Sequence, residues 1–412
     1  MLDVIIIGAG AAGLAAARRL EAARASFRIL EAKAHIGGRA VTDTRTLGAP
    51  VDLGGHWLHS PKLNPLTPLA DRYGFHVKHS AEDFRVTQGG AFLNAADLAD
   101  CLAYVDACFD KIGAVAADQV DCAVAELFPF PGKWHGMFEA AFLAKQGVAL
   151  ARASALDFAR YVWEGDDAPV LDGFGALIAR HAQGLPVELE TPATRVDWSG
   201  KDGITVETPQ GPLLARTVVL AISTGVLAAE QIRFSSSLPD WKLQAINDLP
   251  MGSCNKVALG FTHDAFGVSD VMLMPELSPG LAVEFVVREG GRNIVTTMFN
   301  GPAAKEIAAQ GARACADHAL TLLAGIFGND IRKSVTDRLV FADWDHDPFV
   351  RGCYAAALPG RYFARAELAR PVEDRLFFAG EATHDIYMGD IHGAHLSGEA
   401  AADAVLDVLR TK

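Results

Sequence analysis

The hydrophobic pattern is strongest at the beginning of the chain. Val4-Ile5-Ile6-Ile7 is apolar at every position, which is typical of a central strand that a parallel sheet buries on both faces. An alanine-rich stretch at 11–20 follows and predicts a helix, and a second short strand is predicted over 27–30. Strand, helix and strand in this order predict the beginning of a parallel α/β sheet.

The pattern changes twice further along the chain. Residues from about 92 to 159 are rich in alanine and leucine and predict helices, with a break at 128–132. A β-branched strand at 217–222 and an apolar strand at 376–380 follow, and we expect both to join the first sheet. The other expected elements are helices at 173–181, 303–310, 314–326 and 391–409, and strands at 187–189, 204–207, 256–261, 281–287 and 293–298.

These elements predict an α/β fold with two domains. The first is a Rossmann-like nucleotide-binding domain, expected to be discontinuous over 1–75, 175–235 and 340–412. The second is an inserted α+β substrate-binding domain over 76–174 and 236–339, and it contains a helical subdomain. The length of 412 residues is enough for each domain to bury its own core.

A glycine motif joins the first strand to the first helix. Gly8 permits a tight turn, Gly10 lets the backbone approach a pyrophosphate, and Gly13 lets the helix lie close to the strand. The free N–H groups of the first helical turn, around Ala12, would bind the phosphates. Glu31 ends the second strand, where a carboxylate usually binds the ribose hydroxyls. The motif therefore predicts a dinucleotide site.

Charge and cysteine content narrow the function further. The formal net charge is −13, which argues against nucleic acid and anionic membranes and slightly favours a cationic substrate. The six cysteines show neither a CxxC pair nor metal-ligand spacing, so we expect reduced thiols and no metal. The sequence shows no basic leader region and no apolar run of about 20 residues. We therefore expect a cytoplasmic protein.

The segment after Glu31 distinguishes between two cofactors. Ile36-Gly37-Gly38-Arg39 resembles the second glycine-rich loop of the glutathione-reductase-like FAD proteins, in which the arginine reaches the phosphates. The resemblance implies FAD rather than NAD, with Gly38 and Arg39 among the cofactor contacts.

Four sequence blocks resemble the flavin amine oxidase superfamily, which includes monoamine oxidases, polyamine oxidases and lysine-specific histone demethylases. The second block is similar to the polyamine oxidase loop under the flavin, so the resemblance is greatest to that branch. The region at about 80–170 matches no family pattern, and we expect substrate identity to depend on it. The blocks are 8–13 with 37–39, 53–59, 251–257, and 347–354 with 378–398.

The resemblance implies a reaction and a residue that assists it. A hydride equivalent would pass from the carbon next to an amine to flavin N5, the imine would hydrolyse, and O2 would reoxidise the flavin to give H2O2. In the family, the lysine at the place of Lys256 holds a water near N5, and a fixed cation can favour oxygen reduction. Lys256 shares a strand face with Ala258 and Gly260, which a flat ring could approach. The alternative is a solvated strand lysine.

The resemblance also implies an aromatic pocket for the amine. Tyr354 would form one wall and Trp344 would pack beside the isoalloxazine, with ordinary core filling as the alternative for each. At the opposite wall, where monoamine oxidases have tyrosine and the demethylases threonine, this chain has Asp390. That residue is either the N-cap of the last helix or an acid that faces the flavin and recognises a protonated amine.

Three further features of the sequence each allow two interpretations. Cys353 stands where monoamine oxidases attach FAD through a thioether, whereas polyamine oxidases and demethylases usually have serine; we favour non-covalent FAD. His59 could contact a distal substrate nitrogen or be a satisfied loop histidine. Glu164, Asp166 and Asp167 could lie at a channel mouth, although a solvated loop is the simpler interpretation.

The resemblance implies further flavin contacts in the loop under the ring, in a backbone contact to adenine and in the last helix. These contacts are Gly54, Gly55, His56, Trp57, Ala193, Gly380, Glu381, Asp390 and Ile391.

The function and the substrate each have alternatives. Instead of an amine oxidase, the chain could be a flavin desaturase, a protoporphyrinogen-oxidase-like enzyme, or an FAD-binding scaffold or redox sensor. The sequence leaves the substrate open between a polyamine, a monoamine, an N-methylated amine and an amino acid.

Overall fold

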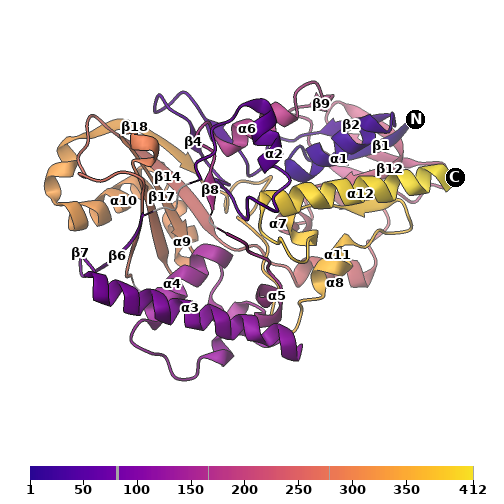
Figure 1. Ribbon diagram of the computed structural model, residues 1–412. Coiled ribbons are helices and arrows are strands. Elements are labelled where there is room, and N and C mark those ends of the chain that lie inside the picture. The colour runs from indigo at the N-terminus through magenta and orange to yellow at the C-terminus, as the bar shows by residue number, and fades with distance from the viewer. Residues whose placement is uncertain (80–82, 166, 278, 412) are drawn as a thin grey trace.

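Two large sheets with helices packed against them dominate the computed structural model, which describes residues 1–79, 83–165, 167–277 and 279–411. Figure 1 shows the sheets side by side, with both ends of the chain beside the first. The mixed α/β fold predicted from the sequence is confirmed. No helix among the described residues has the length and apolar composition needed to cross a bilayer.

The first sheet draws its parallel strands from distant parts of the chain, as predicted. β1 (Leu2–Ile7) lies between β2 (Phe27–Leu30) and β12 (Gly211–Leu220), and β12 also pairs with β19 (Leu376–Phe378). Val4 to Ile7 are buried, and alternate residues pack into the cores on opposite faces. The other strands of this sheet are β9 (Val187–Glu188), β10 (Arg195–Asp197), β11 (Ile204–Thr208) and β13 (Arg233–Phe234).

Helices cover both faces of this sheet. α1 (Ala11–Ala22) and α12 (Ile391–Thr411) lie side by side on one face (Figure 1). A Cβ added at Gly13 would lie 2.0 Å from the Gly8 carbonyl oxygen, so Gly13 provides the close helix–strand approach that the sequence predicts. The helices α7 (Thr224–Ala228), α8 (Asp240–Asn247) and α11 (Ala364–Ala369) lie on the other side.

The second sheet has the order β18-β14-β17-β16-β15-β6-β7. α9 (Pro302–Ala308) and α10 (Ala312–Phe327) pack on one face of it. The predicted strands at 256–261, 281–287 and 293–298 are present, whereas the sequence did not predict β15, β18, β6 or β7. The strand bounds are β6 Asp83–Gln88, β7 Ala91–Phe92, β14 Cys254–Phe261, β15 Val271–Pro275, β16 Ala282–Val287, β17 Ile294–Asn300 and β18 Val335–Ala342.

The predicted helical region packs below the second sheet in Figure 1. It contains α3 (Ala95–Asp118), α4 (His135–Gln146) and α5 (Ala155–Ala159), with the predicted break between α3 and α4. The side chain of Asn94 caps α3 by accepting hydrogen bonds from two backbone N–H groups of its first turn. Smaller elements are α2 (Thr67–Tyr73), α6 (Phe174–His181), β3 (Thr42–Asp43), β4 (Val51–Asp52), β5 (Trp57–Leu58) and β8 (Ala168–Pro169).

The chain segment before β14 packs with the first sheet. Ala245 and Ile246 of α8 lie in the same apolar cluster as Ile5 and Val218, although the sequence analysis placed residues 236–339 in the substrate-binding domain. The division of the chain into two domains stays a prediction.

Candidate active site

One large cavity, of about 1780 Å³, is lined by both sheets and by the helical region. Every predicted site residue lines it except Gly13, which lies within α1 where that helix packs against Gly8. The predicted residues that line the cavity are Gly8, Gly10, Ala12, Glu31, Gly38, Arg39, Gly54, Gly55, His56, Trp57, His59, Ala193, Lys256, Trp344, Cys353, Tyr354, Gly380, Glu381, Asp390 and Ile391.

At the first-sheet end, the cavity combines backbone donors with a carboxylate. α1 begins after Gly10, which offers no capping side chain, and its first turn holds no acid. The N–H groups of that turn are therefore suited to phosphate. The buried Glu31 carboxylate accepts 2.8 Å hydrogen bonds from the backbone N–H groups of Ala9 and Lys33, so the glycine turn fixes its position beside the cavity.

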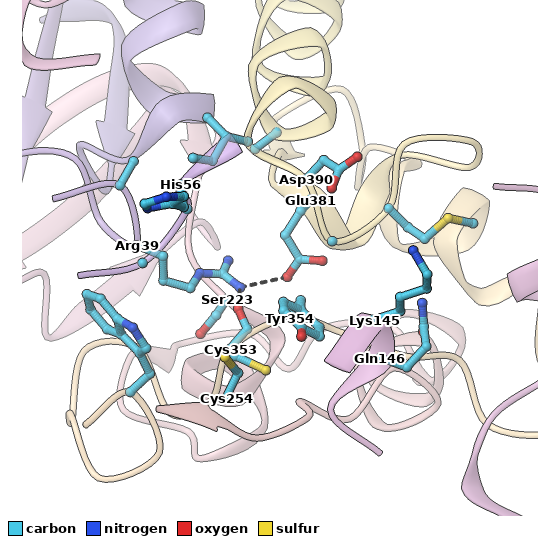
Figure 2. Close-up of a pocket in the computed structure, with 18 of the residues that line it drawn as sticks. Arg39, His56, Lys145, Gln146, Ser223, Cys254, Cys353, Tyr354, Glu381 and Asp390 are labelled. Carbon is cyan, nitrogen blue, oxygen red and sulfur yellow. Dashed lines mark hydrogen bonds and ion pairs between the residues drawn. The ribbon is translucent and has the colours of Figure 1, made fainter. Parts of the chain in front are cut away.

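Arg39 connects the N-terminal loop to the C-terminal blocks. Its guanidinium pairs with Glu381 at 2.9 Å (Figure 2) and also donates to the Cys353 carbonyl. Glu381 is buried and accepts from the Ala355 N–H at 3.2 Å. The arginine and the acid predicted as cofactor contacts thus hold two cavity walls together.

Lys256 is buried, so the alternative of a solvated strand lysine is wrong. Its ammonium donates a 2.5 Å hydrogen bond to the Gly54 carbonyl and lies 5.7 Å from the centre of a Trp57 ring. Burial lowers the pKa of Lys256, while the acids Asp52, Glu284 and Glu289 oppose that shift. The loop under the predicted flavin site therefore fixes the position of the lysine.

The small residues on the face of Lys256 have a different role from the one expected. Ala258 packs against Val51, and a Cβ added at Gly260 would approach a Leu47 methyl group at 3.3 Å. Neither Ala258 nor Gly260 lines the cavity. The expectation that a flat ring approaches them is wrong, because the loop before β4 covers that part of the strand.

His56 connects the loop at 53–59 to the turn that follows β16. Its Nε2 lies 2.8 Å from Oε1 of Glu289, and its Nδ1 lies 4.0 Å from the buried Asp52. Burial acts to raise the pKa of Glu289, but the nearby His56 helps to lower it below its ordinary value. The histidine therefore sits in an acidic, mostly buried setting that fixes the loop.

The two predicted aromatic residues direct their polar atoms at backbone carbonyl groups. The Trp344 indole donates a 3.0 Å hydrogen bond to Leu53, and the Tyr354 hydroxyl donates a 2.7 Å bond to Ala144. Burial raises the pKa of Tyr354 far above its ordinary value. Its phenol therefore stays neutral, and both rings contribute apolar surface to the cavity.

Asp390 stands just before α12 and lines the cavity. Its carbonyl accepts from the Ala394 N–H at 3.0 Å at the beginning of α12, while its carboxylate lines the cavity and accepts a 2.6 Å hydrogen bond from Tyr161. Burial raises the pKa of Asp390. His59 Nε2 lies 3.9 Å from the same carboxylate.

His59 lies between two acids. Its Nδ1 is 2.8 Å from Asp167, and, although burial opposes protonation, the charges of Asp390 and Asp167 raise the pKa of His59 to about 9. Asp167 is therefore ion-paired rather than part of a merely solvated loop. Glu164 is exposed, and Asp166 lies outside the described residues.

Cys353 is a buried, free thiol that lines the cavity. Burial raises its pKa well above the ordinary value, so the thiol stays protonated. A protonated thiol is a poor nucleophile, which favours non-covalent cofactor binding. Among the described residues, no group of three or more His, Cys, Asp or Glu side chains is arranged to hold a metal ion.

The sequence missed several cavity residues. Tyr161 lies in an irregular segment after α5, where no pattern indicates it. Glu284, by contrast, could have been found from strand alternation, because Val283 and Phe285 are in the core and the residue between them must face the other way. Asn300 and the apolar side chains of Met137, Met272, Met274 and Met298 also line the cavity.

The chain belongs to the flavin-containing amine oxidoreductase family, whose model matches residues 11–146 and 113–406. It is 28% identical to polyamine oxidase 2 of Arabidopsis thaliana, over 97% of this chain and 87% of that protein. It is also 28% identical to polyamine oxidase 4 of Oryza sativa subsp. japonica, over 97% and 88%. The solved structure of cyclohexylamine oxidase from Brevibacterium oxydans IH-35A has a TM-score of 0.82 and 25% identity, with 99% of each chain covered.

Membership in this family makes the protein an FAD-dependent amine oxidase, as its motifs imply. The residues of the cavity fit FAD. The uncapped first turn of α1 suits phosphates, Glu31 suits the ribose, and Lys256 and Trp344 line the same cavity.

Proposed function

We propose that the enzyme oxidises a polyamine, or another primary or secondary amine, with O2 as the electron acceptor. The observation that carries this proposal is the buried Lys256, which lines the same cavity as the aromatic residues Trp344 and Tyr354. The names of the polyamine oxidase relatives support this choice of substrate. When bound, FAD supplies the acceptor for the hydride equivalent.

Lys256 would act as a fixed donor at the reaction centre. Because the Gly54 carbonyl already binds its ammonium, the lysine can hold a water or stabilise developing negative charge without first rearranging. Trp344 and Tyr354 would surround the amine with apolar surface. This surface favours the neutral amine, because burial costs a neutral amine less hydration free energy than it costs an ammonium.

Asp390 would attract the substrate as an ammonium and then accept its proton. The hydrogen bond from Tyr161 directs the carboxylate, and burial raises its pKa, which makes proton uptake easier. His59 would hold the negative charge of Asp390 in place rather than donate to a cationic nitrogen, because its own pKa is raised.

The cofactor would be held by the residues that line the first-sheet end of the cavity. Glu31 would bind ribose, the first turn of α1 and Arg39 would bind phosphate, and the FAD would be non-covalent despite Cys353. We further propose a cytoplasmic location. The other proposed contacts are Gly8, Gly10, Ala12, Gly38, Gly54, Gly55, His56, Trp57, Ala193, Gly380, Glu381 and Ile391.

Anaerobic titration of the holoenzyme with putrescine, spermidine, N-acetylated polyamines and simple monoamines tests the substrate. We expect at least one polyamine to bleach the flavin absorbance, and bleaching by none of them would contradict the proposal. Lys256→Met should retain the flavin spectrum but slow turnover by about 100-fold, the scale of losing one electrostatic donor. Lys333→Met, which changes an exposed lysine, is the matched control and should leave the rates unchanged.

A further inference from the structure

We propose that Glu284 and Asn300 form a subsite for the second ammonium group of a diamine or polyamine. This inference rests on the proposed function, because it assigns the far end of a substrate whose reacting nitrogen lies near Lys256. It would make Glu284 the residue that distinguishes diamines from monoamines.

The register of the second sheet places Glu284 and Lys256 on the same face. Lys256 of β14 pairs with Met298 of β17, and Met298 pairs with Glu284 of β16. Directly paired residues project to the same side of a sheet. With neighbouring strands about 4.8 Å apart, the backbones at Lys256 and Glu284 are separated by about 10 Å.

Glu284 also acts on the reaction centre through its charge. It is one of the acids that oppose the lowering of the pKa of Lys256, and it helps to raise the pKa of Tyr354, for which burial is the larger cause. Its carboxylate therefore lies within electrostatic reach of both residues while lining the same cavity.

Asn300 supplies a second acceptor beside this carboxylate. Its Nδ2 donates a 3.0 Å hydrogen bond to Oε2 of Glu284, and its side chain is 1% exposed. Its Oδ1 has no hydrogen-bond partner among the described residues. Buried amide oxygens normally have one, and an ammonium group brings three donors. We assign this oxygen as the second acceptor for an ammonium bound at Glu284.

The surface between the two ends suits a methylene chain. Met298 lies directly between Lys256 and Glu284 in the strand register, and Met272 and Met274 of β15 also line the cavity. Methionine side chains are apolar and adapt to irregular shapes. The cavity therefore offers an acceptor pair at one end, the reaction centre at the other end and an apolar surface between them. This arrangement matches the chemistry of an α,ω-diamine.

The test compares diamines and monoamines of equal chain length. For the holoenzyme, kcat/KM is measured for α,ω-diamines from three to ten carbons and for the n-alkylamines of the same lengths. We expect one diamine length to be preferred over its monoamine. Glu284→Gln should reduce that preference by about 10- to 100-fold, the scale of a hydrogen bond to a charged group, with little change for monoamines. Asn300→Leu should reduce the preference less.

A control variant separates the subsite from general attraction of cations. Asp106→Asn removes a carboxylate from the α3 wall of the same cavity and should leave the diamine preference unchanged. An equal loss in both variants, or a preference that survives Glu284→Gln, overturns the subsite. Oxidation of monoamines and diamines at equal rates overturns the subsite alone, whereas the absence of any amine oxidation overturns the proposed function as well. Flavin absorbance and thermal unfolding confirm that each variant is folded.

Discussion

The Tyr161 hydroxyl donates a 2.6 Å hydrogen bond to Oδ2 of Asp390, and both side chains line the cavity. The two residues come from the segment after α5 and from the residue just before α12. A carboxylate at the cavity wall is thus oriented by a phenol from the helical region. The contact couples the part of the chain expected to select the substrate to the part that begins the last helix.

Removing either member of this pair should weaken recognition of the amine. Asp390→Asn removes a charge and is expected to raise the apparent KM for amines by about 10-fold or more, while Tyr161→Phe should raise it by about 2- to 12-fold. Steady-state kinetics from pH 6 to pH 10 measure both. If Asp390→Asn changes neither KM nor its pH dependence, the residue serves only to begin the helix.

His59 should make stability depend on pH. Its pKa rises from the ordinary 6.5 to about 9 in the fold, where Lys145 and His392 are its other titratable neighbours. Its positive charge therefore stabilises the fold fully below about pH 6.5, and this contribution is lost as pH rises through 9. Asp167→Asn should lower the denaturant midpoint at pH 6 and have a smaller effect at pH 10. If Asp167→Asn lowers the denaturant midpoint by the same amount at pH 6 and pH 10, this expectation is wrong.

A buried ion pair that does not line the cavity should contribute strongly to stability. Arg365 Nε and Asp157 Oδ1 lie 2.6 Å apart, and the two side chains are 1% and 4% exposed. Removing one partner leaves a buried charge, so Arg365→Met should lower the free energy of unfolding by about 3–5 kcal/mol. Arg410→Met, which breaks an exposed pair with Asp407, should change it by less than about 0.5 kcal/mol. Similar unfolding midpoints for the two variants would contradict the prediction.

If FAD is bound non-covalently, the mass of the denatured protein should show no attached flavin. After acid precipitation, the intact protein should have the mass of the polypeptide alone, and the flavin should remain in the supernatant, because the Cys353 thiol is buried and protonated. Cys353→Ser should bind the same amount of FAD. A mass increased by one FAD would show that the thioether forms.

Local patterns predicted the parts of the site that local structure determines. The turn at Gly8 to Gly13 and the acid after β2 depend on a single strand–helix–strand unit, so their spacing in the sequence was sufficient. Alternation along β14 also put Lys256 on the correct face. It could not show that the loop at 47–53, some 200 residues earlier in the chain, covers Ala258.

The missed elements have weak local signals. β18 carries the polar residues Thr336, Asp337 and Arg338 in succession, since it is an edge strand that is partly exposed. Likewise, Tyr161 comes from an irregular segment and reaches the cavity only through tertiary packing. Residues of this kind become visible only when the three-dimensional fold is known.

The position of β19 and α12 affects how the protein is made. β12 receives β19 as a neighbour, and the apolar face of α1 packs on α12, yet both partners lie more than 150 residues further along the chain. A nascent chain on the ribosome therefore displays an incomplete sheet and an uncovered helix until residues 376–411 have been made. Truncation before Leu376 should consequently yield insoluble polypeptide rather than a slightly weakened enzyme.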